Sequence, residues 1–168
     1  MVFSAAATTS AEAKRMLALL VMSGVYAVPL PKVPLPPALQ ELQGEWRAIS
    51  VEEKGKAWDG KEQVAEVCLE IAGDTLIYKR NMDYVEKFRI TLTPGKKPAW
   101  LDLRLIAEGV DPAKASHAIY ALEGGKLKLC LATEFTANDP EARPQEFTTG
   151  GQRPPQGKLL FVMERVKK

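Results

Sequence analysis

The chain has 168 residues, of which 46% are hydrophobic and 26% are charged, and its formal net charge is +2. These values are typical of a globular protein with one core, and they exclude extensive disorder and a polybasic nucleic-acid-binding protein. Two cysteines and one histidine cannot supply a four-cysteine, two-cysteine–two-histidine or three-histidine zinc site within one chain. We therefore expect no metal and no cofactor, and the sequence contains no P-loop, dinucleotide-binding or zinc-protease motif.

The first 38 residues differ in charge from the rest of the chain. They hold three basic residues and one acidic residue, which leaves 20 basic and 20 acidic residues for positions 39–168. Within this segment, Lys14-Arg15 precedes an apolar run of 13 residues at 16–28. Such a pattern over residues 1–28 is typical of a secretory signal peptide, and the run is shorter than the roughly 20 residues that span a bilayer. We expect an exported protein with no integral membrane span in its mature domain; the alternatives are a helix docked on a cytoplasmic domain and a fragment or mis-assigned start.

Residues 29–38 form a Pro-rich linker, with five prolines between Pro29 and Pro37. Proline disfavours helices and central strands and favours extended polyproline II. The favoured interpretation is a stiff spacer between the export segment and a domain at 39–168. A ligand for an SH3 or WW domain is the alternative.

Period-2 alternation recurs from Leu42 onward, and helical periodicity is scarce. In the stretch 99–107, for example, Leu101, Leu103 and Leu105 alternate with polar or aromatic residues. Glycine-containing turns at 72–75 and 122–126 are suited to tight hairpins. Eight strands are predicted: Gly44–Glu52, Val64–Ala72, Thr75–Arg80, Tyr84–Thr93, Ala99–Ala107, His117–Leu122, Lys126–Ala132 and Lys158–Val166.

These strands predict an all-β domain, an eight-stranded antiparallel meander. Closing the meander into a barrel removes its exposed edges, and an open sandwich is the main competitor. The segment 133–157 is rich in Pro, Gly, Thr and Asn and is predicted to be one long loop before the last strand.

An ordered set of motifs over residues 40–166 resembles a domain of unknown function from planctomycete-type bacteria. The motifs are an L-x-G-x-W opening at Leu42–Trp46, a strand with Lys97-Pro98 before Leu101-Asp102-Leu103, a hairpin at Ala118–Cys130, R-P-x-x-F at Arg143–Phe147, and a closing strand at Leu159–Arg165. The resemblance implies a lipocalin-like barrel, often on exported proteins, with no established activity.

The opening motif is also similar to that of lipocalins. The resemblance implies that Trp46, which follows Gly44, packs beneath Arg165 of the last strand and closes one end of the barrel. A guanidinium stacked on an indole stabilises a protein by roughly 0.5–2 kcal/mol. The sequence departs from the lipocalin pattern, because it shows no convincing second lipocalin motif and we expect no helix after the last predicted strand.

The candidate ligand-binding residues are Arg143, Phe147 and Tyr120. If the mouth of the barrel binds a ligand, we expect the loop 133–157 to form its rim with Arg143 and Phe147. The alternative is that Arg143 anchors this loop through hydrogen bonds to carbonyl groups.

The single histidine, His117, offers little for catalysis. Adjacent side chains on a strand point to opposite faces, so Ser116 and His117 cannot act as nucleophile and base for each other. Carboxylates such as Asp102 are interpreted as surface ion-pair partners. Cys68 and Cys130 lie on strands that are not neighbours in a meander, which favours two separate thiols over a disulfide, although export permits one.

We therefore expect a non-enzymatic, exported, lipocalin-like domain that binds a small hydrophobic or peptidic ligand or serves as an interaction module. No nucleic-acid partner is expected, because the basic doublets are scattered. A hydrolase with a site at the barrel mouth and a structural cell-envelope domain are the alternatives.

Overall fold

The computed structural model describes residues 34–81, 84–136, 139–150 and 157–167. A compact unit extends from Leu35 to Lys168. The predicted signal segment 1–28 and most of the predicted linker 29–38 lie outside the described residues.

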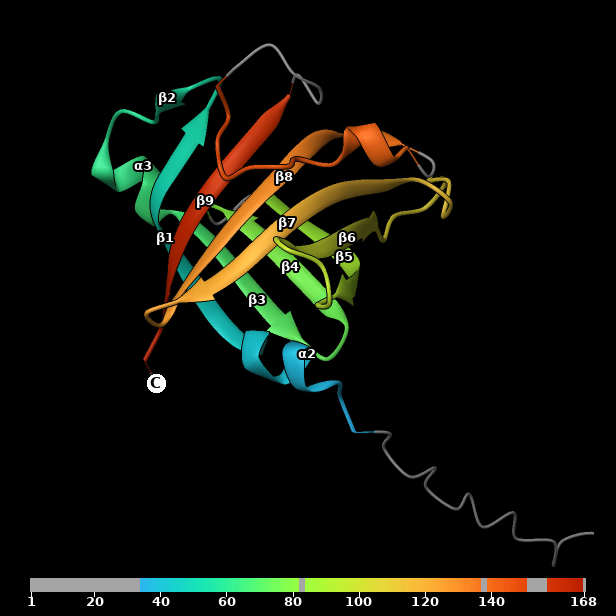
Figure 1. The fold of residues 1–168 in the computed structure, drawn as a ribbon. Helices are drawn as coiled ribbons and strands as arrows, with labels where there is room; N and C mark the ends of the chain where they lie inside the picture. The colour runs from blue at the N-terminus through green and yellow to red at the C-terminus, as the bar shows by residue number, and fades with distance from the viewer. Residues whose placement is uncertain (1–33, 82–83, 137–138, 151–156, 168) are drawn as a thin grey trace, which may run out of the picture. The chain divides into compact units, whose positions relative to one another are not determined.

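Eight antiparallel strands form a closed barrel, as the sequence predicts (Figure 1). Each strand pairs with the next along the chain, and β1 also pairs with β9 from Trp46↔Arg165 to Glu53↔Leu159, which closes the sheet. The barrel strands are β1 (Gly44–Glu53), β3 (Val67–Ala72), β4 (Thr75–Arg80), β5 (Tyr84–Thr93), β6 (Ala99–Leu105), β7 (Ala115–Glu123), β8 (Lys126–Thr136) and β9 (Lys158–Arg165).

Alternate side chains of each strand fill the interior of the barrel. On β6, Leu101 and Leu103 are buried, whereas Trp100, Asp102 and Arg104 point outward. Leucine, isoleucine and phenylalanine from six of the barrel strands line the core, and the large members besides Leu101 and Leu103 are Leu69, Ile71, Leu76, Phe88, Ile90, Leu127, Leu129 and Phe161. The other two strands add Trp46, Ala48 and Val51 from β1 and Ala118 and Tyr120 from β7.

The structure differs from the predicted segments at several places. The predicted strand Val64–Ala72 begins at Val67, because 61–65 form the short helix α3 (Lys61–Ala65) after Gly60, which has a φ of 107°. A two-residue strand, β2 (Lys56–Ala57), pairs with the end of β1. β8 continues to Thr136 and a 3-10 helix occupies Pro140–Ala142, so the segment predicted as one loop from 133 is partly ordered by hydrogen bonds with β7.

The helix α2 (Pro37–Leu42) lies at one end of the barrel (Figure 1). Pro37 is at its first position, where the missing N–H costs no hydrogen bond, so the end of the Pro-rich stretch begins a helix. Leu39 and Leu42 are buried in the core, and Leu35 packs partly against it.

The three residues expected at the closed end of the barrel are brought together there. Trp46 is 1% exposed and its indole Nε1 donates a hydrogen bond to the Leu42 carbonyl at 2.9 Å. Arg165 places its Cζ 4.3 Å from the Trp46 ring centroid and donates hydrogen bonds to the carbonyls of Gln43 and Glu41. Gly44 has a φ of 112°, and a Cβ at this position would lie 3.1 Å from Arg165 Nη1, so glycine suits this position both in conformation and in space.

Replacing Arg165 should therefore destabilise the barrel. We expect Arg165→Ala to lower the free energy of unfolding by about 2–4 kcal/mol, because it removes the stacked cation and two charge-assisted hydrogen bonds. Arg165→Lys should recover part of the loss, since an ammonium group cannot form the same fork. Urea unfolding measures the effect; equal values for Arg165→Ala and for Lys126→Ala, an exposed control on β8, contradict the expectation.

Candidate functional site

A cavity of about 570 Å³ opens at the end of the barrel opposite α2. The residues around it include the last of β4, the first of β5 and residues near the end of β8 and the start of β9. It is lined by Leu69, Leu76, Tyr78, Arg80, Asn81, Tyr84, Glu86, Phe88, Leu103, Ser116, Leu129, Leu131, Ala132, Thr133, Phe135, Leu159 and Phe161. Its size and apolar lining are those of a site for a small organic molecule.

Five aromatic side chains make the cavity distinctive, and they contact one another in pairs. The ring of Tyr78 lies edge-on to Tyr84 and to Phe161, with centroids 6.1 and 6.3 Å apart. Phe88 and Phe135 are nearly parallel, with an interplanar angle of 9° and centroids 6.3 Å apart. Tyr84 and Phe135 are exposed at the rim, so aromatic surface continues from the interior to the mouth.

A bulge between β7 and β8 shapes one side of this mouth. Ser116 pairs with Phe135 and Ala118 pairs with Leu131, so three residues of β8, 132–134, lie opposite His117 alone. The Ser116 hydroxyl donates a hydrogen bond of 2.5 Å to the Ala132 carbonyl, which becomes available at the bulge. The bulge thereby holds the part of β8 that carries Phe135 over the cavity.

Two opposite charges flank the tyrosines of the cavity. Burial raises the pKa of Tyr78. The positive charge of Arg80 lowers this pKa, and the negative charge of Glu86 raises it. A hydrogen bond with Glu86 raises the pKa of Tyr84. The Arg80 guanidinium also lies 4.6 Å from the ring centroid of Trp58, on the segment after β2.

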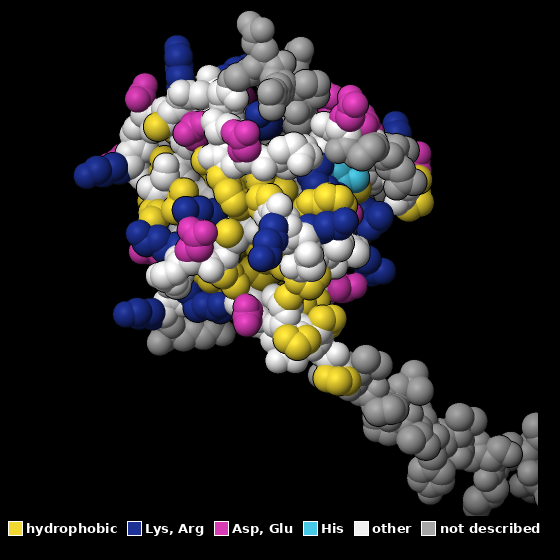
Figure 2. All heavy atoms as spheres, viewed as in Figure 1, with side chains coloured by type: hydrophobic (Ala, Val, Ile, Leu, Met, Phe, Trp, Pro, Cys, Tyr) yellow, Lys and Arg dark blue, Asp and Glu magenta, His cyan; other side chains and the backbone are white. Residues whose placement is uncertain are grey.

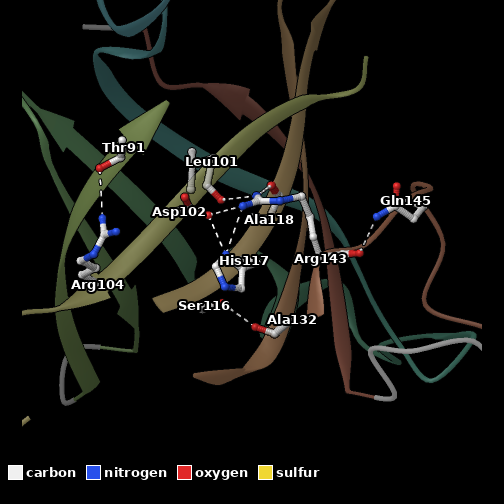
Figure 3. A network of polar contacts seen from close by, with 10 residues as sticks. All are labelled: Thr91, Leu101, Asp102, Arg104, Ser116, His117, Ala118, Ala132, Arg143 and Gln145. Atoms are coloured by element: carbon white, nitrogen blue, oxygen red, sulfur yellow. Dashed lines mark hydrogen bonds and ion pairs between the residues drawn. The ribbon is translucent and has the colours of Figure 1, made fainter. Parts of the chain in front are cut away.

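Residues 139–150, here called the strap, pack on the outer face of the barrel, and Arg143 anchors them (Figure 3). Arg143 is 6% exposed; its Nη1 donates to the carbonyls of Ala118 (2.6 Å) and Leu101 (3.3 Å), and its Nη2 donates to Asp102 Oδ1 (2.5 Å). Its Cζ also lies 4.5 Å from the ring centroid of Trp100. Two roles are predicted for Arg143, ligand binding at the barrel mouth and anchoring of the loop through hydrogen bonds to carbonyl groups. The geometry agrees with the anchoring role.

Asp102 is predicted to be a surface ion-pair partner; it does form an ion pair, with Arg143, but its side chain is half-buried at the centre of this cluster. Its Oδ1 also lies 2.8 Å from Nδ1 of His117, its direct partner across the β6–β7 ladder. Partial burial raises the pKa of Asp102, but the hydrogen bonds from His117 and Arg143 and the charge of Arg143 outweigh burial and lower the pKa below its usual value.

His117 and Asp102 resemble the pair in which a carboxylate orients a general base. His117 is only 7% exposed, however, and its Nε2 is buried with no hydrogen-bond partner among the described residues. Neither residue lines the barrel-mouth cavity. In this conformation a substrate cannot reach Nε2, so the pair offers no support for the hydrolase alternative.

The second end of the strap is tied to the β1–β2 hairpin. The Thr149 hydroxyl donates to Glu52 Oε1 (2.5 Å) and accepts a hydrogen bond from the N–H of Gly55 (2.8 Å). Between the two anchors the strap covers Cys130, whose Sγ lies 3.9 Å from the Thr148 carbonyl oxygen. Cys68 and Cys130 are both free thiols.

The predicted ligand-binding residues do not line the cavity. Tyr120 is buried in the core and pairs with Ala99 and Leu129, Arg143 anchors the strap, and Phe147 is a half-buried residue of the strap. A ligand role for these three residues stays a prediction. The cavity is instead lined by aromatic residues on predicted strands, such as Tyr84 and Phe88. Their alternation is visible in the sequence, but alternation does not distinguish residues that line a cavity from residues that fill a core.

Comparisons of the chain with protein-family models, with curated proteins and with solved structures give no match. Within the described ranges, no helix is long and apolar enough to cross a membrane, and no three His, Cys, Asp or Glu residues are grouped so that they could hold a metal ion. Acidic and basic side chains are interspersed on the face shown in Figure 2. The cavity is therefore the feature of the structure that points most directly to a function.

The lowered pKa of Asp102 predicts a pH-dependent contribution to stability. A carboxylate with a lowered pKa in the folded state stabilises it above the unfolded-state pKa, here 3.8, and that contribution is lost as pH falls through the folded-state pKa. We expect Asp102→Asn to lower the free energy of unfolding by about 1–3 kcal/mol at pH 7 and the gap to wild type to narrow below about pH 4. Urea unfolding from pH 3 to 7 measures this gap; a gap that is constant with pH, or one equally large for the exposed control Asp59→Asn, contradicts the assignment.

The burial of Cys130 predicts unequal reactivity of the two thiols. Burial raises the pKa of Cys130 to about 11, so almost no thiolate exists at pH 7.5, whereas Cys68 is half-buried on β3. Under native conditions, maleimide labelling followed by mass spectrometry should give one adduct, on Cys68, and two adducts in urea. Rapid native labelling of Cys130 in the Cys68→Ser variant would show that the strap does not cover it.

Proposed function

We propose that this chain is a binding protein that holds a small hydrophobic ligand in the cavity at the open end of its barrel. The observation that carries the proposal is the cavity of about 570 Å³ lined mainly by leucine and aromatic side chains. A ligand that buries roughly 300 Å² of apolar surface gains about 7 kcal/mol from leaving water, before the entropy costs of binding. A small molecule is favoured over a peptide because the cavity lies between closed barrel strands and not along an open sheet edge.

The proposal also includes export and the resemblance to the planctomycete-type domain. Export is supported by the basic pair and the apolar run ahead of the Pro-rich segment. The resemblance is supported by the ordered motifs between residues 40 and 166. Both remain independent of the ligand-binding proposal, which rests on the cavity alone.

Blocking the cavity tests the proposed function. N-phenyl-1-naphthylamine, an uncharged probe whose emission rises in apolar surroundings, should bind the full chain saturably at one site. Leu131 lines the cavity and is half-buried, so Leu131→Trp places extra volume inside it and should weaken probe binding about 10-fold or more. Ile49→Trp is the matched control, because Ile49 is 42% exposed and is not among the residues that line this cavity.

Two results would overturn the proposed function. One is the absence of saturable binding to the wild-type chain at a probe concentration below that at which the probe aggregates. The other is equal binding by wild type and a folded Leu131→Trp variant, which would place the probe elsewhere, for example on the apolar segment 16–28. Thermal unfolding of both tryptophan variants shows that each is folded.

A further inference from the structure

The two sides of the barrel-mouth cavity differ in chemistry. On the β4–β5 side, the lining residues Tyr78, Arg80, Asn81, Tyr84 and Glu86 carry hydroxyl, guanidinium, amide and carboxylate groups. On the β8–β9 side, aliphatic and phenyl side chains prevail, and Thr133 is the one polar member among the described lining residues. A bound molecule therefore meets hydrogen-bonding groups on one side and apolar surface on the other.

The charges in the cavity lining balance. Among the described lining residues there is one cation, Arg80, and one carboxylate, Glu86. Both act on the same hydroxyl group, because they shift the pKa of Tyr78 in opposite directions. A ligand with a net charge would lose water on entering this apolar space and would be attracted by one of the two groups while being repelled by the other.

The aromatic lining favours a ligand that carries rings. Aromatic pairs arranged edge-to-face or offset-stacked are more stable than their buried area alone accounts for. The five rings of the cavity present both faces and edges, since Phe88 and Phe135 are parallel whereas Tyr78 is tilted against Tyr84 and Phe161. The cavity volume of about 570 Å³ lies in the range of sites that hold small organic molecules, which is room for a molecule of two or three rings.

We infer that the ligand is an uncharged aromatic amphiphile of two or three rings, whose hydroxyl-like polar end lies against Tyr78, Tyr84 and Glu86. A hydroxyl group suits this end because it donates to the Glu86 carboxylate and accepts from Arg80 or a tyrosine hydroxyl. The ring system then lies between Phe88, Phe135 and Phe161. The inference rests on the proposed function, since it names the class of molecule that the same cavity holds.

Displacement of N-phenyl-1-naphthylamine from the full chain tests the inference with four matched competitors. These are biphenyl-4-methanol, its carboxylate analogue biphenyl-4-carboxylate, its cationic analogue biphenyl-4-methylamine, and the non-aromatic 4-cyclohexylcyclohexanol. We expect biphenyl-4-methanol to bind tightest, the two charged analogues about 10-fold or more weaker because of desolvation, and the non-aromatic alcohol about 3-fold or more weaker because it lacks ring contacts.

Altering the charge balance of the cavity supplies a second readout. Glu86→Gln leaves Arg80 as the charged lining residue, so the ratio of carboxylate to alcohol affinity should rise about 5-fold. Glu123→Gln is the matched control, because it makes the same chemical change in an ion pair with Lys128 at the closed end of the barrel. This control should leave the ratio unchanged, and a purely structural role of Glu86 would not change the ratio between the two ligands.

The outcomes separate this inference from the proposed function. If the probe binds in the cavity but a charged or non-aromatic competitor matches biphenyl-4-methanol, the inference is overturned and the proposed function stands. The inference is also overturned if Glu86→Gln and Glu123→Gln give the same affinity ratios as wild type. If the probe shows no saturable binding sensitive to Leu131→Trp, both are overturned.

Discussion

The pairing of β1 with β9 is the interaction on which the rest of the structure depends. It joins the first and last barrel strands, from Trp46↔Arg165 at one end to Glu53↔Leu159 at the other, so the sheet has an inside and an outside. Because strand side chains alternate, every second residue is then committed to the interior. Without this ladder, the leucine and aromatic residues would line an open, exposed sheet face.

The closed barrel has two ends, one sealed by side chains and one that contains a cavity. At one end, α2, Trp46 and Arg165 seal the interior with stacking and with hydrogen bonds to the carbonyls of Glu41, Leu42 and Gln43. At the other end, the bulge of β8 and the end of the β4–β5 hairpin surround a cavity. The sealed end contributes stability, whereas the open end provides the space that the proposed function uses.

The polar residues that anchor the strap stabilise the fold and do not line the cavity. Arg143 donates hydrogen bonds to two carbonyl groups and to Asp102, yet both residues lie on the outer face of β6 and β7 (Figure 3). Their ion pair holds the strap on the barrel, where the Thr148 carbonyl oxygen lies 3.9 Å from Cys130 Sγ. A cluster of Asp, His and Arg is thus explained here by attachment of a loop.

The sequence by itself determined the barrel strands and the faces of most of them, because period-2 alternation and glycine turns are local signals. It placed Leu101 and Leu103 inward, and its motifs named Trp46 and Arg165 for the closed end. It missed α3, whose five residues are too few for a periodic pattern, and the extension of β8, whose pairing depends on β7. Only the tertiary structure decided that Asp102 faces His117, that Arg143 reaches Asp102, and that Tyr78, Phe88, Phe135 and Phe161 surround a cavity. These facts depend on cross-strand register and on how completely side chains fill a closed barrel, which no single stretch of sequence encodes.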